Sequence, residues 1–210
     1  MLVNGKPGKA GQQVEPGVDS ILVEGRPVLL PKGNLYLMLN KPAGLITTTA
    51  DERGRRTVME LVGEHAGLFP VGRLDRESRG LLLFTDDGTL AARLLHPRYH
   101  VEKEYRVLVS GRPSRDALRR IREGVTLDNE RLMPARVSLL RSNPERTRLA
   151  MVLKEGRKRE VRRIWEALGH PVIDLQRVRL GSLRLGDLPE RNVRPLTRGE
   201  IGQLRREVGL

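Results

Sequence analysis

The sequence predicts an α+β fold, and three observations carry this prediction. Short apolar runs typical of buried strands are separated by amphipathic stretches typical of helices. The two kinds of segment alternate irregularly along the chain, whereas a doubly wound parallel sheet needs regular strand–helix alternation. The chain of 210 residues is also long enough to bury a hydrophobic core without disulfide bonds.

The first 32 residues differ in composition from the rest of the chain. They are rich in Gly, Pro and Val, and their β-like pieces, ILVEG and RPVLL, stand between turns such as NGKPG and EPGVD. These pieces are too short for an independent core. From Asn34 the run NLYLML predicts a buried strand. We therefore expect a small β-rich segment over residues 1–32 and a main domain over residues 33–210.

In the first half of the main domain, three apolar runs are expected to form strands. NLYLML ends at an Asn-Lys-Pro turn, LFPVG follows at residues 68–72, and GLLLFT occupies residues 80–85. The acidic pair before Gly88 predicts a turn and a helix cap. Three leucines between residues 90 and 95 then supply the apolar face of a helix.

The second half continues with strands and helices of similar length. EYRVLVSG alternates as a strand does, Ser114 caps the next helix, and Gly124 stops it. LMPARVSLL and RTRLAMVLKEG predict two further strands. KREVRRIWEALG places Val161, Ile164 and Trp165 on one helical stripe. The tail predicts one more β region, VIDLQRVRLGSLRL, and a final helix.

Charge limits the class of partner. The chain has 39 Lys and Arg against 26 Asp and Glu, a net charge of +13. Arginine dominates, and its planar guanidinium suits phosphates and stacked bases. A polyanion is therefore the natural partner. The alternative is a solvated, salt-bridged surface of the kind found in thermophilic proteins.

Several classes of protein are excluded by composition. The absence of Cys excludes disulfides, thiolate metal sites and a cysteine nucleophile. No apolar run approaches the roughly 20 residues that span a bilayer, and the start MLVNGKPGKAG lacks the apolar core of a secretory signal. We expect a cytoplasmic protein with no membrane partner.

The first candidate for chemistry is GRLDRESRG at residues 72–80, which lies between two apolar runs. Asp75 is flanked along the chain by Arg73, Arg76 and Arg79. Nearby cations favour the ionised carboxylate and keep it available as a nucleophile or charge stabiliser. A purely structural salt-bridged loop is the alternative.

The second candidate is KEGRKREVRR at residues 154–163, a basic turn that opens an amphipathic helix. Its cations and the free backbone amides at the helix start would attract phosphates. A solvated helix face is the alternative. An arginine on the inner edge, such as Arg162, is able to turn inward and pair with the carboxylate of Asp75.

The third candidate is EKEYRV, in which Tyr105 is one of only six aromatic residues. An aromatic ring beside cations can stack on a base, whereas a tyrosine in a strand often packs in the core. Few aromatics argue against a stacking platform for extended single strands. One flipped base needs only one ring.

Other chemistries lack their motifs. The four histidines show no helical metal spacing, and no phosphate-binding glycine loop is present. Ser78 lacks the setting of a hydrolase nucleophile. A metal-dependent nuclease would need a carboxylate cluster such as Asp75, Asp86 and Asp87, but a turn and helix cap explain the last two more simply. We expect no metal and no cofactor.

Four segments together resemble the RsuA-type pseudouridine synthases, which modify ribosomal RNA. NKPAG (40–44) is similar to the family's first motif, and GRLDRESRGLLLFTDDG (72–88) resembles its catalytic motif. KEYRV (103–107) resembles the segment that carries its base-stacking tyrosine. EGRKREVRRIWEALGHPV (155–172) resembles the motif that carries its active-site arginine. The resemblance covers about residues 34–205.

This resemblance implies a pseudouridine synthase catalytic fold, with a largely antiparallel central sheet flanked by helices. It implies that Asp75 is the essential carboxylate, that Tyr105 lies against the target uracil, and that Arg162 is the ion-pair partner of Asp75. Val172 or Ile173 would supply an apolar wall for the base. Ser78 stands where the family usually has threonine, so the hydroxyl is kept.

The resemblance also implies an isomerase that needs neither cofactor nor metal and acts on ribosomal RNA, free or in an assembling subunit. We expect the protein to be a monomer. Trp165 and the LLLFT run favour large-subunit RNA; small-subunit RNA and a non-catalytic RNA-binding or ribosome-assembly role are the alternatives. The basic residues of the motifs are expected to contact RNA: Lys41, Arg73, Arg76, Lys103, Arg157, Lys158, Arg159 and Arg163.

The front of the chain departs from the family pattern. Members usually begin with a small alpha-L RNA-binding module, whose helices precede a VNGK-like strand. Here MLVNGK starts within that pattern, so residues 1–32 are expected to be only the β part of the module. A truncated chain, a misassigned start and a natural lack of the helices are all consistent with this beginning.

Overall fold

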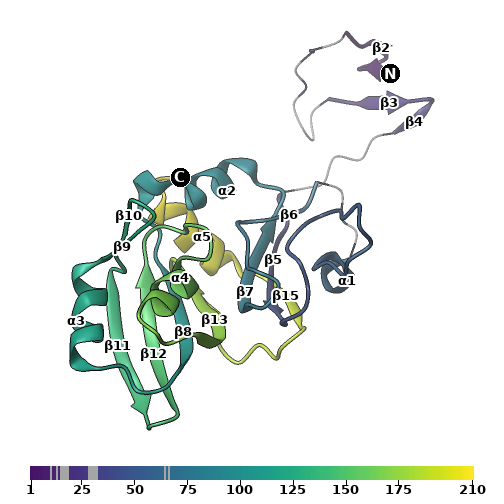
Figure 1. Cartoon of the computed structure of the whole chain (residues 1–210). Helices are drawn as coiled ribbons and strands as arrows, with labels where there is room; N and C mark the ends of the chain where they lie inside the picture. The colour runs from purple at the N-terminus through teal and green to yellow at the C-terminus, as the bar shows by residue number, and fades with distance from the viewer. Residues whose placement is uncertain (10, 13, 15–18, 28–32, 64, 66) are drawn as a thin grey trace. The chain divides into compact units, whose positions relative to one another are not determined.

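The computed structural model describes residues 1–9, 11–12, 14, 19–27, 33–63, 65 and 67–210. The chain divides into two compact units, Met1–Asn34 and Leu35–Leu210 (Figure 1). The division lies close to the boundary expected from composition. Part of the RPVLL piece and most of the EPGVD turn lie outside the described residues.

The first unit contains a small antiparallel sheet in the order β2-β1-β3-β4. Its strands are β1 (Leu2–Val3), β2 (Lys6–Pro7), β3 (Ile21–Val23) and β4 (Arg26–Pro27). Two-residue turns join the outer pairs, and each has positive φ at both positions, as at Asn4 (51°) and Gly5 (77°). Turns of this kind match the twist of a hairpin and explain the NG signal.

Over the described residues of the second unit, nine strands form one mixed sheet. Seven lie in the order β11-β12-β8-β13-β7-β5-β15, while β14 pairs with β13 and β6 pairs with β7. Every pairing except β13–β7 is antiparallel, which confirms the predicted largely antiparallel α+β fold. The strands are β5 (Tyr36–Lys41), β6 (Phe69–Pro70), β7 (Arg79–Thr85), β8 (Lys103–Ser110), β11 (Arg136–Ser142), β12 (Arg146–Leu153), β13 (Val172–Leu180), β14 (Leu183–Arg184) and β15 (Val193–Pro195).

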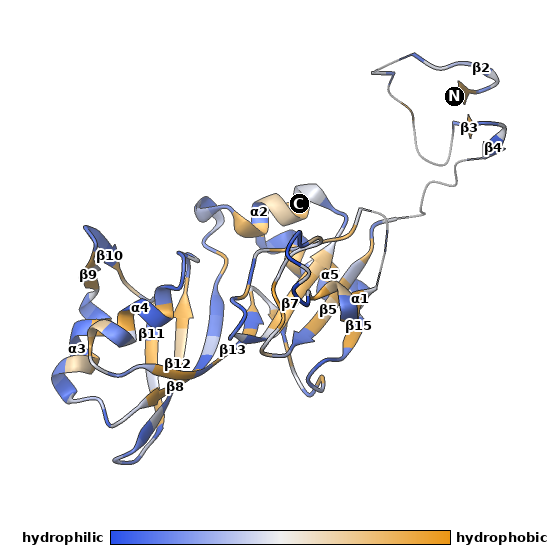
Figure 2. Cartoon of the chain, turned by 45° about the vertical axis from the view of Figure 1, so that its right-hand side comes forward, coloured by the Kyte–Doolittle hydropathy of each residue, from blue (hydrophilic) through white to orange (hydrophobic). Residues whose placement is uncertain are grey.

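Helices cover both faces of this sheet, and their bounds are α1 (Met59–Val62), α2 (Gly88–Leu95), α3 (Arg115–Glu123), α4 (Glu160–Ala167) and α5 (Arg198–Glu207). Apolar side chains of α1, α3 and α4 pack in one core cluster, and those of α2 and α5 pack in another. Strands β5 and β7 contribute to both clusters, so their sequences are apolar at consecutive positions rather than at alternate ones. Figure 2 shows hydrophobic residues along these strands.

The helix caps are the ones that the sequence predicts. The Asp87 carboxylate accepts a hydrogen bond from Leu90 N, and the Ser114 hydroxyl accepts one from Ala117 N. The short elements were not predicted, because a few residues give no readable periodicity. They are α1, β15, the 3₁₀ turn η1 (Pro97–Tyr99) and the hairpin of β9 (Val125–Leu127) and β10 (Glu130–Leu132).

The parallel contact between β7 and β13 joins the two halves of the sheet. It is only two pairs long, Gln176 with Arg79 and Arg177 with Gly80. A Cβ added at Gly80, where φ is 103°, would lie 2.2 Å from the carbonyl oxygen of Arg177. Only glycine therefore allows the strands to approach at this point. The loop that carries Asp75 leads directly into this junction.

Candidate active site

Parts of three of the four motifs, together with strand β13, line one cleft of about 630 Å³. The segments are the loop of residues 72–78, strand β8, the chain between β12 and α4, and strand β13. Asp75 and Tyr105 both line the cleft. Its apolar wall comes from Leu74, Leu95, Leu153, Val161 and Leu175.

Backbone hydrogen bonds hold the loop that carries Asp75. Ser78 N donates to the carbonyl oxygen of Asp75 at 3.0 Å and closes a tight turn. The Thr47 hydroxyl donates to Leu74 O at 2.8 Å and accepts from Leu74 N at 3.3 Å. Gly44 N donates to Arg76 O at 2.8 Å. The backbone on each side of Asp75 is thus fixed by the segment after β5, which includes the unpredicted Thr47.

Lys41 is the centre of this support. Its side chain is 0% exposed, and its Nζ donates to the carbonyl oxygens of Pro42, Asp75, Arg76 and Ser78 at 3.0, 3.2, 3.4 and 2.7 Å. Burial lowers the pKa of Lys41 from 10.5 to about 8, against the opposing charges of Asp75, Glu77 and Glu190. The structure gives Lys41 a role in holding the loop, because its ammonium is buried and bound to these carbonyl oxygens, and its predicted contact with RNA stays a prediction.

The arginines beside Asp75 in the sequence do not pair with it in space. Arg79 binds Asp174 through two hydrogen bonds of 2.8 and 2.6 Å, and Arg76 lies 3.9 Å from Glu77. Arg73 is exposed at the cleft. In the part of the chain that the structure describes, no ion pair within 4.0 Å involves Asp75.

Arg162 touches the loop but does not form the predicted direct ion pair with Asp75. Its Nη2 donates to Glu77 O at 3.4 Å, and its Nη1 donates to Val172 O at 3.3 Å. Its Nε is buried and has no hydrogen-bond partner among the described residues. Burial lowers the pKa of Arg162, with Arg159 acting in the same direction and Asp75 opposing it.

Tyr105 belongs to the hydrophobic core and also lines the cleft. It lies on β8 in register with Met151 of β12 and Arg177 of β13, so these three side chains share one face of the sheet. The residue is buried in the first core cluster and also lines the cleft. The two interpretations offered by its sequence, core packing and base stacking, are therefore compatible.

Four of the predicted RNA-contacting residues form an exposed basic rim on the cleft, namely Arg73, Arg157, Lys158 and Arg159. We call these four residues the basic rim. Arg157 also pairs with Glu155 at 2.9 Å. Arg163 instead pairs with Asp128 and Glu130 at 3.0 and 2.9 Å, and neither Arg163 nor Arg76 lines the cleft.

Lys103 and Arg177 lie deeper in the cleft. Their side chains are 8% and 3% exposed. Arg177 was not predicted as a site residue, because its strand carries no recognised motif letter. Val172 and Ile173 were suggested as the apolar wall, but neither lines the cleft, and Ile173 is 57% exposed to solvent.

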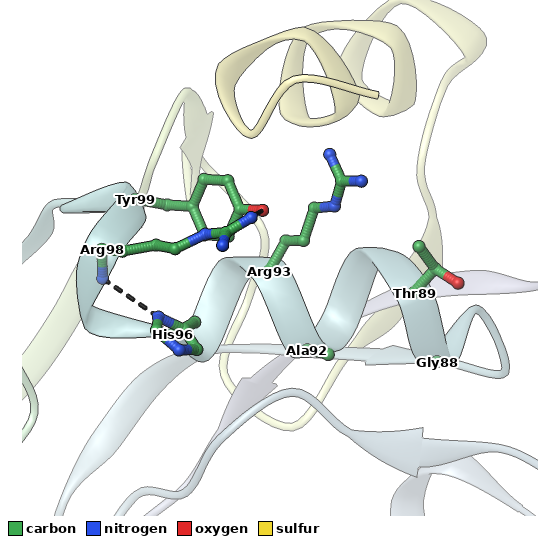
Figure 3. Close-up of a pocket in the computed structure, with 7 residues that line it drawn as sticks. All are labelled: Gly88, Thr89, Ala92, Arg93, His96, Arg98 and Tyr99. Atoms are coloured by element: carbon green, nitrogen blue, oxygen red, sulfur yellow. Dashed lines mark hydrogen bonds between the residues drawn. The ribbon is translucent and has the colours of Figure 1, made fainter.

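A second hollow of about 460 Å³ lies beside α2 and contains none of the predicted site residues (Figure 3). Arg93 on its wall donates to the carbonyl oxygens of Val208 and Gly209 at 3.0 and 2.7 Å, and Arg98 lies 4.6 Å from the ring centroid of Tyr99. Figure 3 also shows the bond from Arg98 N to the His96 ring, 3.1 Å long. These contacts stabilise the chain end and the turn after α2.

The structure bears on the other chemistries as well. Asp87 accepts hydrogen bonds from Tyr36 and Arg205 as well as capping α2, and Asp86 accepts from Leu35 N. Both carboxylates are used by the fold, as expected for a turn and cap. Among the described residues, no three His, Asp or Glu side chains are grouped as a metal site, and no helix is long and apolar enough to cross a membrane.

Comparison with known proteins gives a consistent result. Residues 35–167 match the family model described as RNA pseudouridylate synthase. The chain is 40% identical over 202 residues to an RNA pseudouridine synthase of Aquifex aeolicus, with 95% of this chain and 81% of that protein covered. It is 37% identical over 192 residues to the ribosomal large subunit pseudouridine synthase B of Bacillus subtilis, with 90% and 78% covered.

Comparison of the structure with solved structures agrees with the comparison of sequences. A crystal structure of a pseudouridylate synthase matches with a TM-score of 0.75 and 30% identity, and it covers 97% of this chain and 87% of that one. The matched family region contains the loop of Asp75, strand β8 and helix α4, which meet at the cleft. The chain therefore belongs to the RNA pseudouridine synthase family, as its motifs predicted.

Proposed function

We propose that this protein isomerises a uridine of ribosomal RNA, in the large subunit, to pseudouridine, with Asp75 as the essential carboxylate. The observation that carries the proposal is the meeting of Asp75, Tyr105 and the basic rim at one cleft. The name of the Bacillus subtilis relative supports the choice of the large subunit. Trp165 and the LLLFT run of the sequence favour the same choice.

The reaction breaks the bond from N1 to C1′, turns the base and joins C5 to C1′, with no atom gained or lost overall. Asp75 has three possible tasks in it: addition to the sugar, addition to the base, or removal of a proton. Tyr105 would stack on the flipped uracil. Unstacking a base costs a few kcal/mol. Contacts from the basic rim to phosphates would offset this cost.

Arg162 fits this reaction as a positioning residue. Its guanidinium reaches the catalytic loop through Glu77 O, and its hydrogen bonds of 3.3 and 3.4 Å are long. Catalytic hydrogen bonds are often long without substrate and tighten in the complex. The unpartnered Nε is a free donor for such a rearrangement.

Two rival functions lead to different observations. A non-catalytic ribosome-assembly protein would keep the basic rim but would not need the carboxylate of Asp75. A small-subunit enzyme would need Asp75 but would modify the other ribosomal RNA. The chemistry of Asp75 and the location of the modified uridine therefore separate all three proposals.

The test is to map pseudouridines in ribosomal RNA from cells with and without the gene, and from gene-deleted cells that carry either the wild-type protein or Asp75→Asn. We expect one or a few large-subunit sites to disappear with the gene and to return only with the wild-type protein. RNA binding by Asp75→Asn should be retained, because the substitution keeps the shape of the side chain. A modification restored by Asp75→Asn would contradict the enzyme, and a missing site in small-subunit RNA would contradict the target.

A further inference from the structure

The floor of the cleft holds two buried cations that the catalytic motifs leave unexplained. Lys103 is 8% exposed and Arg177 is 3% exposed, and both line the cleft. We call them the floor cations. Over residues 33–63, 65 and 67–210, neither has a carboxylate oxygen within 4.0 Å. Buried charges in folded proteins are normally paired, because desolvation of a lone charge is costly.

The hydrogen bonds of the floor cations are incomplete. Arg177 Nε donates to Leu81 O at 2.8 Å, which ties β13 to β7, but its Nη2 is buried without a partner among the described residues. Lys103 Nζ makes one long bond, 3.3 Å, to Lys154 O. Burial lowers the pKa of Lys103 and the charge of Arg177 lowers it further, while Glu160, which also lines the cleft, and Glu155 oppose the shift. An acceptor that enters the cleft would relieve both groups.

The position of the floor cations indicates which acceptor that is. Arg177 stands opposite Tyr105 in the register of β13 and β8, and Lys103 lies two residues before Tyr105 on the same face of β8. Phosphates of an RNA chain remain in solvent and suit the exposed basic rim. The part of a flipped nucleotide that reaches buried cations beside the stacking ring is the base.

We propose that Lys103 and Arg177 form an anion hole for the uracil base, donating hydrogen bonds to its carbonyl oxygens as the base separates from the sugar. This inference rests on the proposed function in one respect, that the target uridine enters the cleft of Asp75. It gives Lys103, already expected to contact RNA, a specific role toward the base, and it adds Arg177 as a new substrate-contacting residue. One of them, Arg177, lies outside the four motif segments.

The reaction places negative charge on the uracil base, and hydrogen-bond donors at its carbonyl oxygens would stabilise that charge. When the N1–C1′ bond breaks, its electron pair stays on the base and spreads from N1 to O2 and O4. The deficit at C1′ is met by the carboxylate of Asp75 or by loss of a C2′ proton to it. When C5 then bonds to C1′, the carboxylate is displaced from C1′ or returns its proton to C2′, the C5 proton leaves and N1 gains one. If Asp75 instead adds to C6, the displaced electron pair also moves onto O4, so the base becomes negative by either route.

The first arm of the test measures the single-turnover rate and RNA affinity of Arg177→Met and Lys103→Met, on an RNA that contains the mapped uridine. Methionine replaces the aliphatic stem of either side chain and removes the buried charge, so folding should be retained. We expect the rate at saturating protein to fall about 100-fold or more for Arg177→Met, the scale for loss of one preorganised donor. The RNA Kd should change less than about threefold. Arg148→Met, an exposed arginine on β12, is the matched control and should behave as wild type.

The second arm changes the substrate. A 2-thiouridine or 4-thiouridine at the target replaces one carbonyl oxygen by sulfur, which is a weak acceptor. The thio effect is the fall in rate when sulfur replaces one of these oxygens. At the oxygen that accepts the hydrogen bond, it should be large for the wild type and much smaller for Arg177→Met, because the two changes remove the same interaction. A purely structural role for Arg177 would leave the thio effect equal in both proteins.

Three results would overturn the inference: wild-type rates in both folded methionine variants, a loss confined to RNA affinity, or equal thio effects in wild type and variant. If Arg177→Met does not fold, the test rests on the rate of Lys103→Met and on the rates of the wild-type enzyme with the thio substrates. The anion hole is contradicted if neither rate differs from that of the wild-type enzyme with the normal uridine. Asp75→Asn is measured alongside. Activity that survives Asp75→Asn contradicts the proposed function, whereas an inactive Asp75→Asn with a fully active Arg177→Met contradicts only the anion hole.

Discussion

At the scale of single residues, Asp75 owes its place to backbone hydrogen bonds rather than to its neighbours in the sequence. Lys41 and Thr47 bind the carbonyl oxygens and amides around it, while Arg76 and Arg79 pair with other carboxylates. A loop held by its backbone presents its side chain in one geometry before substrate arrives. The carboxylate itself stays available at the cleft.

The buried Lys41 predicts a pH dependence. Its pKa of about 8 means that the ammonium loses a proton, and so a donor to the loop, as pH rises through that value. We expect the catalytic rate to fall above about pH 8, approaching about tenfold per pH unit. A rate–pH profile checks this, with Lys41→Arg as control because an arginine stays charged. The same fall in Lys41→Arg would contradict the role of Lys41.

The stability of the protein should move in the opposite direction. The folded-state pKa of Lys41 lies below its ordinary value of 10.5, so between about pH 8 and 10.5 the unfolded chain binds more protons at this site. The contribution of Lys41 to the free energy of unfolding therefore rises with pH in that window. Urea unfolding of wild type and Lys41→Met at pH 7.5 and 9.5 should show this difference, so lost activity would not reflect unfolding.

Tyr105 predicts a contrast between two substitutions. Phenylalanine keeps the ring, and no hydrogen bond of the hydroxyl is seen among the described residues, so Tyr105→Phe should retain most of the activity. Leucine keeps the apolar packing but removes the stacking surface, which is worth about 1–3 kcal/mol per base, or roughly 5- to 150-fold in rate. Single-turnover kinetics measure both variants. Equal rates for Phe and Leu would remove the stacking role.

At the scale of elements, the site depends on the short parallel contact between β7 and β13. The loop of Asp75 enters β7 there, and Arg177 occupies the partner position on β13. Most strands and the longer helices were predictable, because apolar runs and caps are local signals. This contact was not, because two pairs between strands about 100 residues apart leave no local pattern.

The prediction for the contact between β7 and β13 concerns Gly80. A methyl group at Gly80 would lie 2.2 Å from Arg177 O, on a backbone with φ of 103°. We expect Gly80→Ala to destabilise the protein by about 3 kcal/mol or more and to abolish activity. Gly88→Ala is the control, since nothing lies within 4 Å of a Cβ there and the residue is helical. Urea unfolding of both variants checks the difference, and a Gly80→Ala as stable as wild type would show that the strands adjust.

At the scale of the whole molecule, the cations behind the net charge of +13 have different environments. Arg79, Arg179, Arg194 and Arg163 are each paired with at least two carboxylate oxygens. The basic rim lines the cleft and is exposed, and of its four residues Arg157 also pairs with Glu155. The two interpretations of the charge are therefore compatible, because ion pairs use some of the cations within the fold, and polyanion binding by the rim stays a prediction.

The rim predicts the salt dependence of RNA binding. For each phosphate that is no longer neutralised, the slope of log Kd against log salt should decrease by about 0.7 to 0.9. Arg73→Gln and Lys158→Gln should each reduce the slope by that amount and leave the rate at saturating RNA unchanged. Binding titrations at several salt concentrations measure this, with Arg148→Gln as the control. Slopes identical to wild type in both rim variants would place the RNA backbone elsewhere.

The sequence by itself determined the α+β class, the longer elements and their caps, the family, and the candidates Asp75 and Tyr105. These follow from periodicity, cap chemistry and motif spacing, which are local properties of the chain. Tertiary structure alone decided what surrounds Asp75: it buried Lys41 beneath the loop, turned Arg79 to Asp174, and brought Arg177 opposite Tyr105. The physical reason is that hydrogen-bond partners and burial depend on distances in space, and neighbours along the chain need not be neighbours in the fold.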